Sequence, residues 1–269
     1  MEGQYAITDE NAITKKLVTD ITQIVNTDTI FLLGKKINTG THIFTHQIAN
    51  EQTVAYWLLI LITGDEKRHK MFQEEIEQKC NAGIAVSCIV AQTSTFQRWI
   101  NEASPFALAV VQKRQSIYNT NLQLELCYNE IINKEIPEIE KNLFQKCFVL
   151  FNEYIAGAEL FTIRKYYRLA LFMYHQATEL LLIAFIKSKT GLVLHTHNIN
   201  HLNSYLSFLL PGIAQGFWGI THREQEAFRL LQKSYCSSRY DDDFIVKYKY
   251  LEIVQQKVNE LRESLYQFK

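Results

Sequence analysis

Short apolar runs alternate with amphipathic stretches in the first 120 residues of the chain. Three such runs occupy residues 29–33, 54–62 and 84–90, and each is bounded by a glycine. Buried strands have this apolar, β-branched and aromatic composition. Between the second and third runs, apolar side chains recur at helical spacing, so the order is strand, helix, strand. That order predicts a parallel crossover and a small α/β domain over residues 1–120.

Long helical periods replace the strand pattern from about residue 119 to the C-terminus. Apolar residues spaced three and four positions apart predict four or five helices. These are expected over residues 137–156, 162–188 and 198–210, from about Thr221, and from the residues after Asp243 to the C-terminus. Short connections predict an up-and-down bundle over residues 138–269, joined to the first domain by residues 121–137. The expected fold class is therefore α+β.

Residues that start and stop helices punctuate this second half. Gly157 is expected to interrupt the helical pattern, and Gly191 to end a helix as a C-cap. Thr221 and Glu224 have the spacing of a capping box at a helix N-terminus. The aspartates at positions 241–243 are expected to cap the N-terminus of the last helix.

Charge and cysteine content limit the possible partners. The 28 basic residues are balanced by 28 acidic ones, so the overall charge cannot hold nucleic acid, although a local basic patch could. No apolar run reaches the roughly 20 residues that a membrane span needs, so no membrane partner is expected. The five cysteines are odd in number and lie mostly in apolar stretches. Reduced, buried thiols in a cytoplasmic protein are typical of this pattern.

Three segments of the helical half carry a family resemblance. Residues 166–182, 196–202 and 238–244 occur in the order and spacing of a HEPN domain, a nucleotide-binding domain of higher eukaryotes and prokaryotes. The chain resembles this family over roughly residues 138–269. The resemblance implies an antiparallel helical bundle that usually dimerises. It also implies one of two functions: a metal-independent ribonuclease, or a non-catalytic module beside a nucleotidyltransferase-like partner.

The pair Arg239–Tyr240 is the strongest candidate for binding. In HEPN ribonucleases an arginine is followed by histidine four to six residues later, but no histidine occupies those positions after Arg239. The resemblance implies that Arg239 holds a phosphate and Tyr240 stacks or forms a hydrogen bond in a polar groove. The alternative is that Arg239 pairs with a carboxylate such as Asp242 or Glu179.

A second candidate set lies within the predicted helix 162–188. Arg168 and His175 are seven residues apart and share one helical face, with Glu179 one turn further on. Glu179 could orient His175 as an acid–base group while Arg168 held a phosphate, which would suit RNA cleavage. The alternative, which we favour, is a buried polar ladder that fixes the packing of the helices.

The first half resembles a nucleotidyltransferase of the polymerase β type in outline. That family has Gly-Ser after the first strand, whereas this chain has Gly34 followed by Lys35, a residue that could contact a phosphate. The family also needs three carboxylates on later strands to hold two metal ions. Residues 55–62 and 83–92 contain no acidic residue. The resemblance therefore implies a degenerate domain without metal, cofactor or phosphoryl transfer.

A zinc site is a further hypothesis, since His195, His197 and His201 are close in sequence. A capping or surface role is favoured, because the segment matches the entrance to the third helix of the HEPN family. Taken together, the sequence predicts a non-catalytic nucleotide- or RNA-binding regulatory protein that is cytoplasmic and dimerises through its helical bundle. The alternatives are a toxin-like ribonuclease that uses Arg168, His175 or Arg239, and a protein-interaction module without a small ligand.

Overall fold

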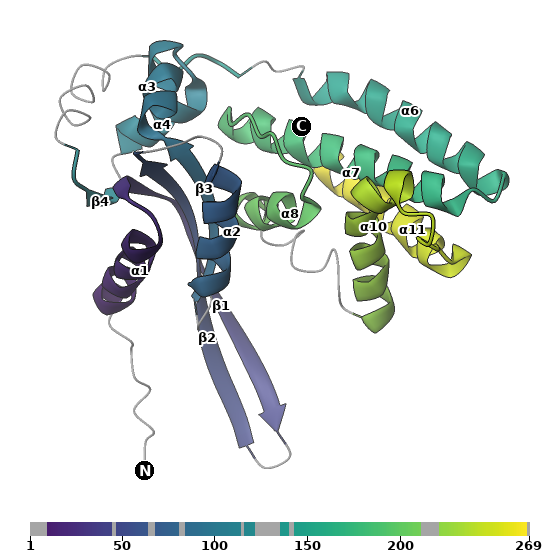
Figure 1. Cartoon of the computed structure of the whole chain (residues 1–269), viewed down its shortest axis with the longest axis horizontal. Helices are drawn as coiled ribbons and strands as arrows, with labels where there is room; N and C mark the ends of the chain where they lie inside the picture. The colour runs from purple at the N-terminus through teal and green to yellow at the C-terminus, as the bar shows by residue number, and fades with distance from the viewer. Residues whose placement is uncertain are drawn as a thin grey trace. The chain divides into compact units, whose positions relative to one another are not determined.

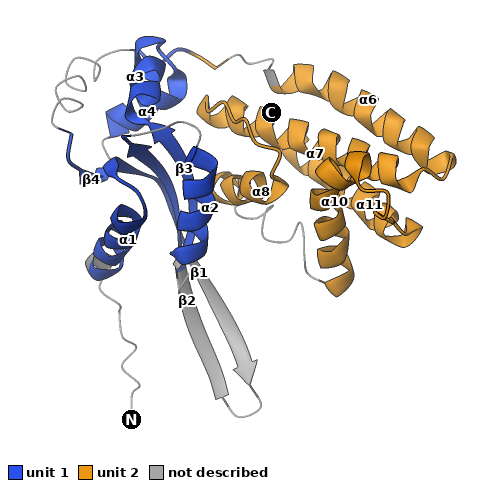
Figure 2. Ribbon diagram, viewed as in Figure 1, with its two compact units in different colours: residues 1–137 blue, residues 138–269 orange. Residues whose placement is uncertain are grey.

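The computed structural model describes residues 10–44, 47–63, 68–80, 84–113, 116–121, 135–139, 143–210 and 221–267. The chain forms two compact units, residues 1–137 and 138–269 (Figures 1 and 2). The first contains a four-stranded mixed sheet with helices, and the second contains helices that pack on one another. This organisation confirms the predicted α+β class.

The N-terminal unit is built around a sheet of order β3-β2-β1-β4. Its elements are α1 (Glu10–Ile24), β1 (Thr27–Phe44), β2 (Gln47–Ile62), α2 (His69–Lys79), β3 (Ile84–Gln92), α3 (Thr93–Asn101), α4 (Pro105–Lys113) and β4 (Ser116–Asn119). Strand β1 is antiparallel to β2 and β4, whereas β2 is parallel to β3. Helix α2 therefore connects two parallel strands, which confirms the predicted crossover.

The core of this unit explains the continuous apolar run of the second strand. Residues 55–62 are buried on both faces of β2, as expected for a strand covered on both sides. Leu17 and Ile21 of α1 and Ile76 of α2 belong to the same buried cluster as alternate side chains of the strands. Helix α1 was not predicted. The hairpin of β1 and β2 also extends further than predicted, because Phe44 pairs with Gln47 at its far end.

The C-terminal unit is organised around one buried helix. Its elements are α6 (Leu143–Ile163), α7 (Tyr167–Thr190), α8 (Ile199–Leu209), α10 (His222–Tyr240) and α11 (Tyr248–Tyr266). Helix α7 contacts each of the other four. Among the described residues, α7 is also the one helix long and apolar enough to cross a membrane, with a mean hydropathy of 1.6 in its most apolar stretch. Because 61% of that stretch is buried inside the protein, a core helix accounts for its composition.

Three expected helix boundaries are wrong at the start of the bundle. The first helix does not begin at residue 137, because residues 135–139 are not helical and α6 begins at Leu143. Gly157 does not interrupt a helix, because α6 runs through it to Ile163. A Cβ atom at Gly157 would make ordinary contacts of 3.7 Å with Met173 of α7. Packing along α7 thus outweighs the cost of about 1 kcal/mol for glycine within a helix. The second helix begins at Tyr167 instead of residue 162, after a turn in which Lys165 has a positive φ of 62°.

Both predicted glycine and threonine caps are confirmed. Gly191 ends α7 with a left-handed φ of 73°, and its N–H donates to the carbonyl of Lys187 at 2.8 Å. At the start of α10, the Thr221 hydroxyl accepts from the Glu224 N–H at 3.2 Å. The Glu224 carboxylate accepts from the Thr221 N–H at 2.8 Å, which completes the capping box.

The expected aspartate cap of the last helix is wrong. Asp241 is the C-cap of α10, and α11 begins only at Tyr248, with Lys247 as its N-cap residue. Between the two helices the chain makes a turn at residues 242–243, where the Phe244 N–H donates to the carbonyl of Asp241 at 3.2 Å, and the side chains of Phe244 and Val246 are buried. Burial of these alternate side chains delays the start of the helix beyond the point where the aspartates could cap it.

Candidate functional site

A buried histidine lies where α7 packs against α10. His175 has no exposed surface, and the centroid of its ring lies 5.3 Å from that of Tyr235. Its Nδ1 atom lies 3.4 Å from Nε2 of Gln176 and 3.6 Å from Oε2 of Glu179. Among the described residues, Nε2 of His175 has no hydrogen-bond partner in good geometry. His175 and Glu179 therefore face each other one helical turn apart.

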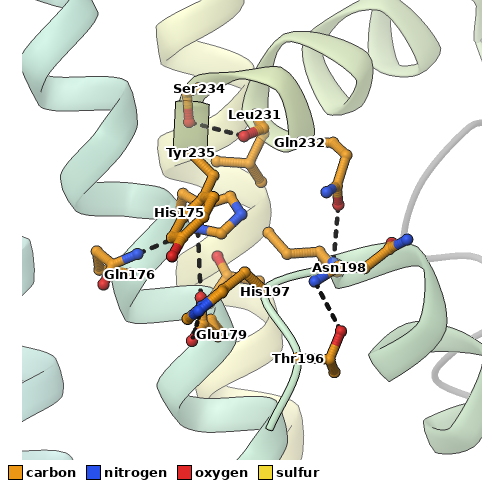
Figure 3. A network of polar contacts seen from close by, with 12 residues as sticks. His175, Gln176, Glu179, Thr196, His197, Asn198, Leu231, Gln232, Ser234 and Tyr235 are labelled. Carbon is orange, nitrogen blue, oxygen red and sulfur yellow. Dashed lines mark hydrogen bonds and ion pairs between the residues drawn. The ribbon is translucent and has the colours of Figure 1, made fainter. Parts of the chain in front are cut away.

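His197 joins this pair from the segment between α7 and α8. Its Nδ1 atom lies 2.9 Å from Oε1 of Glu179. Its ring stacks on that of Tyr235, with centroids 4.2 Å apart and planes 16° apart (Figure 3). Tyr235 of α10 is thus in ring contact with both histidines. We call His175, Glu179, His197 and Tyr235 the His–Glu–Tyr cluster.

Burial shifts the titration of two groups in the cluster. It is the main reason why the pKa of His175 falls from 6.5 to about 4, and the nearby His197 and Arg239 charges lower that pKa further, while the backbone of His197 opposes the shift. Burial also raises the pKa of Glu179, against the effect of the hydrogen bond from His197. His175 is therefore a neutral imidazole at neutral pH, without access to solvent.

The segment that carries His197 is tied to both neighbouring helices. The side chain of Asn198 accepts hydrogen bonds from the first backbone N–H groups of α8, including that of His201. The N–H of Ile199 donates to Oε1 of Gln232 in α10 at 2.7 Å (Figure 3). Asn198, and not one of the histidines, is thus the cap of α8. In the described part of the chain, no three His, Cys, Asp or Glu side chains form a group suited to a metal ion.

Arg239 lies in an aromatic setting near the end of α10. Its guanidinium carbon is 4.7 Å from the ring centroid of Tyr235, 5.0 Å from that of Tyr240 and 5.3 Å from that of Phe172. Its Nε donates to the backbone carbonyl of Tyr235 at 3.0 Å. Arg239 has no ion pair with any carboxylate of the described residues, and Tyr240 is 79% exposed. The guanidinium thus keeps its terminal N–H groups available to an anion.

Arg168 is engaged elsewhere. Its Nη1 donates to the backbone carbonyl of Asp241 at 3.0 Å and lies 3.6 Å from the carboxylate of Asp242. The hydroxyl of Ser238 donates to the carbonyl of Arg168 at 2.9 Å. These contacts join the start of α7 to the end of α10. The structure therefore brings His175 and Glu179 together, but it directs Arg168 to the end of α10.

Lys35 belongs to β1 of the N-terminal unit. Its Nζ lies 6.0 Å from the ring centroid of Tyr56 on β2. The other candidates, Arg239 and Tyr240, belong to the C-terminal unit.

Three side chains of the site were not singled out by sequence reasoning. His197 was considered only as part of a histidine group, whereas Tyr235 and Phe172 were not distinguished from other aromatic residues. Glu179 and His197 are 18 residues apart, and Phe172 and Arg239 lie on different helices. Periodicity within one helix carries no information about such contacts. The one local signal for this site was the position of His197 directly before Asn198, the cap of α8.

Comparison with known proteins assigns the helical unit to a family. The profile of the HEPN domain matches residues 131–266, about half of the chain, so the chain belongs to the HEPN family. The matched residues include the whole His–Glu–Tyr cluster and Arg239. No curated protein matches the sequence.

A crystal structure of a nucleotidyltransferase-like protein from Exiguobacterium sibiricum 255-15 is similar to this chain at 15% sequence identity. The similarity covers 94% of this chain and 74% of that chain, with a TM-score of 0.27. A likeness of this size carries no argument about activity.

Proposed function

We propose that the HEPN unit is a non-catalytic module that binds a phosphate of a nucleotide or RNA at Arg239, with Tyr240 beside it. Membership of the HEPN family supports a nucleotide- or RNA-related role. The observation that carries the proposal is the environment of Arg239, an exposed cation whose guanidinium carbon lies within 5.3 Å of three aromatic ring centroids and which has no carboxylate partner among the described residues. The two carboxylates that are the alternative partners of Arg239 contact other groups: Asp242 contacts Arg168, and Glu179 contacts His197.

The non-catalytic part of the proposal rests on the histidines. No histidine follows Arg239 at four to six residues. His175 is fully buried and neutral at neutral pH, so it would have to leave the core before it could exchange a proton with a substrate. The contacts of His175 with Glu179 and Tyr235 fit a buried polar group that fixes helix packing better than they fit an acid–base catalyst.

The proposal predicts that Arg239→Gln weakens binding of both uridine monophosphate and a short RNA by roughly tenfold or more. One charge-assisted hydrogen bond contributes about 1.5–3 kcal/mol, and tenfold corresponds to about 1.4 kcal/mol. Titration calorimetry of the full chain measures the first ligand, and fluorescence anisotropy measures the second. Arg229→Gln is the matched control, because Arg229 is exposed on the same helix but paired with Glu226 at 2.7 Å.

Equal affinities of the wild type and Arg239→Gln for both ligands would remove Arg239 as a phosphate site. If neither ligand bound to the wild type, the proposed function as a whole would be wrong. Circular dichroism spectra that superimpose for the two variants show that any loss does not come from unfolding.

A ribonuclease remains the second candidate function, and one observation favours His197 over His175 as its acid–base group. His197 is half exposed, Glu179 orients its Nδ1, and Tyr235 contacts both His197 and Arg239. A histidine oriented by a carboxylate beside an arginine is a workable set for phosphodiester cleavage.

The non-catalytic proposal predicts that labelled RNA stays intact with the wild type and with His197→Ala, at metal-free neutral pH and over long incubation. Gel electrophoresis of the RNA measures this. His222→Ala, which changes an exposed histidine at the start of α10, is the control variant. Cleavage by the wild type and by His222→Ala that disappears in His197→Ala would establish the ribonuclease instead.

For the remaining parts of the chain we propose the organisation that the sequence predicts. Residues 1–120 would be a degenerate nucleotidyltransferase-like domain in which Lys35 contacts a phosphate, residues 121–137 a connection, and residues 138–269 the HEPN bundle. The absence of acidic residues from positions 55–62 of β2 supports the loss of catalytic metals. A cytoplasmic location and a homodimer through the bundle belong to the same proposal.

A further inference from the structure

Exposed tyrosines gather where several helix ends of the C-terminal unit meet. Tyr167, at the start of α7, lies against Tyr248, at the start of α11, with ring centroids 5.5 Å apart. The neighbouring Arg168 holds the end of α10 through the carbonyl of Asp241. The starts of α7 and α11 and the end of α10 therefore lie at one end of the bundle.

Three tyrosine rings at this end face solvent. Tyr166 is 54% exposed, Tyr240 is 79% exposed and Tyr248 is 46% exposed. We call these three residues the tyrosine end. Exposed aromatic rings leave apolar area in water, and several of them together on one surface mark a binding site more often than a single exposed ring does.

Cations lie beside two of these rings, and a third cation lies beside the neighbouring ring of Tyr250. The guanidinium carbon of Arg164 is 5.5 Å from the ring centroid of Tyr166, and that of Arg239 is 5.0 Å from the centroid of Tyr240. Nζ of Lys249, in the first turn of α11, is 4.9 Å from the centroid of Tyr250. No ion pair links any of the three cations to a carboxylate of the described residues.

The acidic residues of this end do not cancel that charge. Asp241 is 3.8 Å from Nζ of Lys233, and Asp242 is 3.6 Å from Nη1 of Arg168. Asp243 and Glu252 remain, and Glu252 lies next to the Tyr248 hydroxyl. The tyrosine end thus offers cations to an anionic partner in a chain whose overall charge is zero.

We propose that the tyrosine end binds single-stranded nucleic acid, with bases stacked on Tyr166, Tyr240 and Tyr248 and phosphates held by the adjacent cations. This inference rests on the proposed function, because Arg239 takes part in both. Aromatic rings with cations beside them can bind both the bases and the phosphates of a single strand. A single strand fits and a duplex does not, because the faces of paired bases are already stacked on one another.

Binding of uridine monophosphate, a single-stranded oligouridylate of about twelve nucleotides and the matching RNA duplex to the full chain tests this inference. The single strand is expected to bind roughly tenfold or more tightly than the mononucleotide and than the duplex. Tyr166→Ala and Tyr248→Ala are each expected to weaken the single strand about fivefold or more, since one stacked base contributes that much. Both variants should leave the affinity for the mononucleotide unchanged.

Tyr266→Ala is the matched control, because Tyr266 is 51% exposed on α11 but lies at the end of that helix remote from Tyr248. The affinity for the single strand should also fall with salt, and Arg164→Gln should reduce the slope of log affinity against log salt by about 0.7.

The outcomes separate this inference from the function on which it rests. If the oligouridylate binds no more tightly than the mononucleotide, or if the tyrosine variants bind it like the wild type, the tyrosine end is not a nucleic-acid site, while phosphate binding at Arg239 stands. If the duplex binds as tightly as the single strand, the proposed stacking of unpaired bases on the tyrosine rings is wrong. If polyglutamate binds with the same dependence on Tyr166 and Tyr248, the surface serves an acidic protein instead. If the wild type binds none of the nucleotides, the proposed function is wrong, and the inference that rests on it is wrong as well.

Discussion

Phe185→Ala should lower the free energy of unfolding by about 3–5 kcal/mol, which is the usual cost of truncating a buried phenylalanine. Phe185 lies on α7, has no exposed surface, and its ring centroid is 5.5 Å from that of Phe144 on α6. The truncation removes apolar contacts between the two helices and leaves a cavity that close-packed neighbours fill only in part. The edge-to-face geometry of the two rings, 72° apart, adds to the loss.

Urea unfolding of the full chain, followed by circular dichroism at the helical band, measures this effect, because the bundle contains the longest helices. Val149→Ala is the control, since Val149 on the same α6 is 69% exposed and its truncation should change stability by no more than about 0.5 kcal/mol. A loss below about 1 kcal/mol for Phe185→Ala would mean that α6 does not pack on α7 as described.

Acidification should destabilise the protein through His175, on the order of 3 kcal/mol between pH 6.5 and pH 4. In the folded state burial lowers the pKa of His175 to about 4, whereas the unfolded value is 6.5. Between pH 6.5 and pH 4, His175 is therefore protonated in the unfolded chain but largely neutral in the folded chain. The stability that neutral His175 contributes is fully present above pH 6.5 and is lost as the pH falls toward 4.

Glu179 acts in the opposite direction. Burial raises its pKa in the folded state, so its contribution is present below its unfolded pKa and is lost as the pH rises through the folded pKa. The effect of His175 is therefore isolated by comparison with His175→Gln, whose free energy of unfolding should decline less steeply between pH 6.5 and pH 4. Urea unfolding at pH steps across this window gives both slopes. Parallel slopes for the two proteins would show that His175 is not buried and neutral in the folded state.

Much of the fold follows from local sequence signals. The continuous apolar run at residues 54–62 predicted a strand buried on both faces, and the structure has β2 in that state. The cap at Gly191 and the box of Thr221 with Glu224 were predicted because such caps depend on residues only a few positions apart. The errors at Gly157 and at the aspartates of positions 241–243 arose where packing between helices overrides a local preference.

The candidate site was predicted less completely. Arg239 and Tyr240 were singled out from a family resemblance, and His175 and Glu179 from their spacing on one helix. No spacing rule places Tyr235 against His197, because the two lie in different segments. The same holds for Arg168, whose partners at the end of α10 are at least 70 residues further along the chain.

Sequence patterns alone were enough to predict most of the strands and helices, which of their faces are apolar, two of the helix caps, and the resemblance of the second half to a HEPN domain. The contacts of each polar side chain depend on the packing of the whole unit: Arg239 is exposed beside three aromatic rings, His175 is buried in the core, and Glu179 contacts His197. The physical reason is the distance along the chain over which each kind of interaction acts. Helical and strand periods arise from neighbours within one element, whereas the charge state and exposure of a side chain depend on the elements that pack against it.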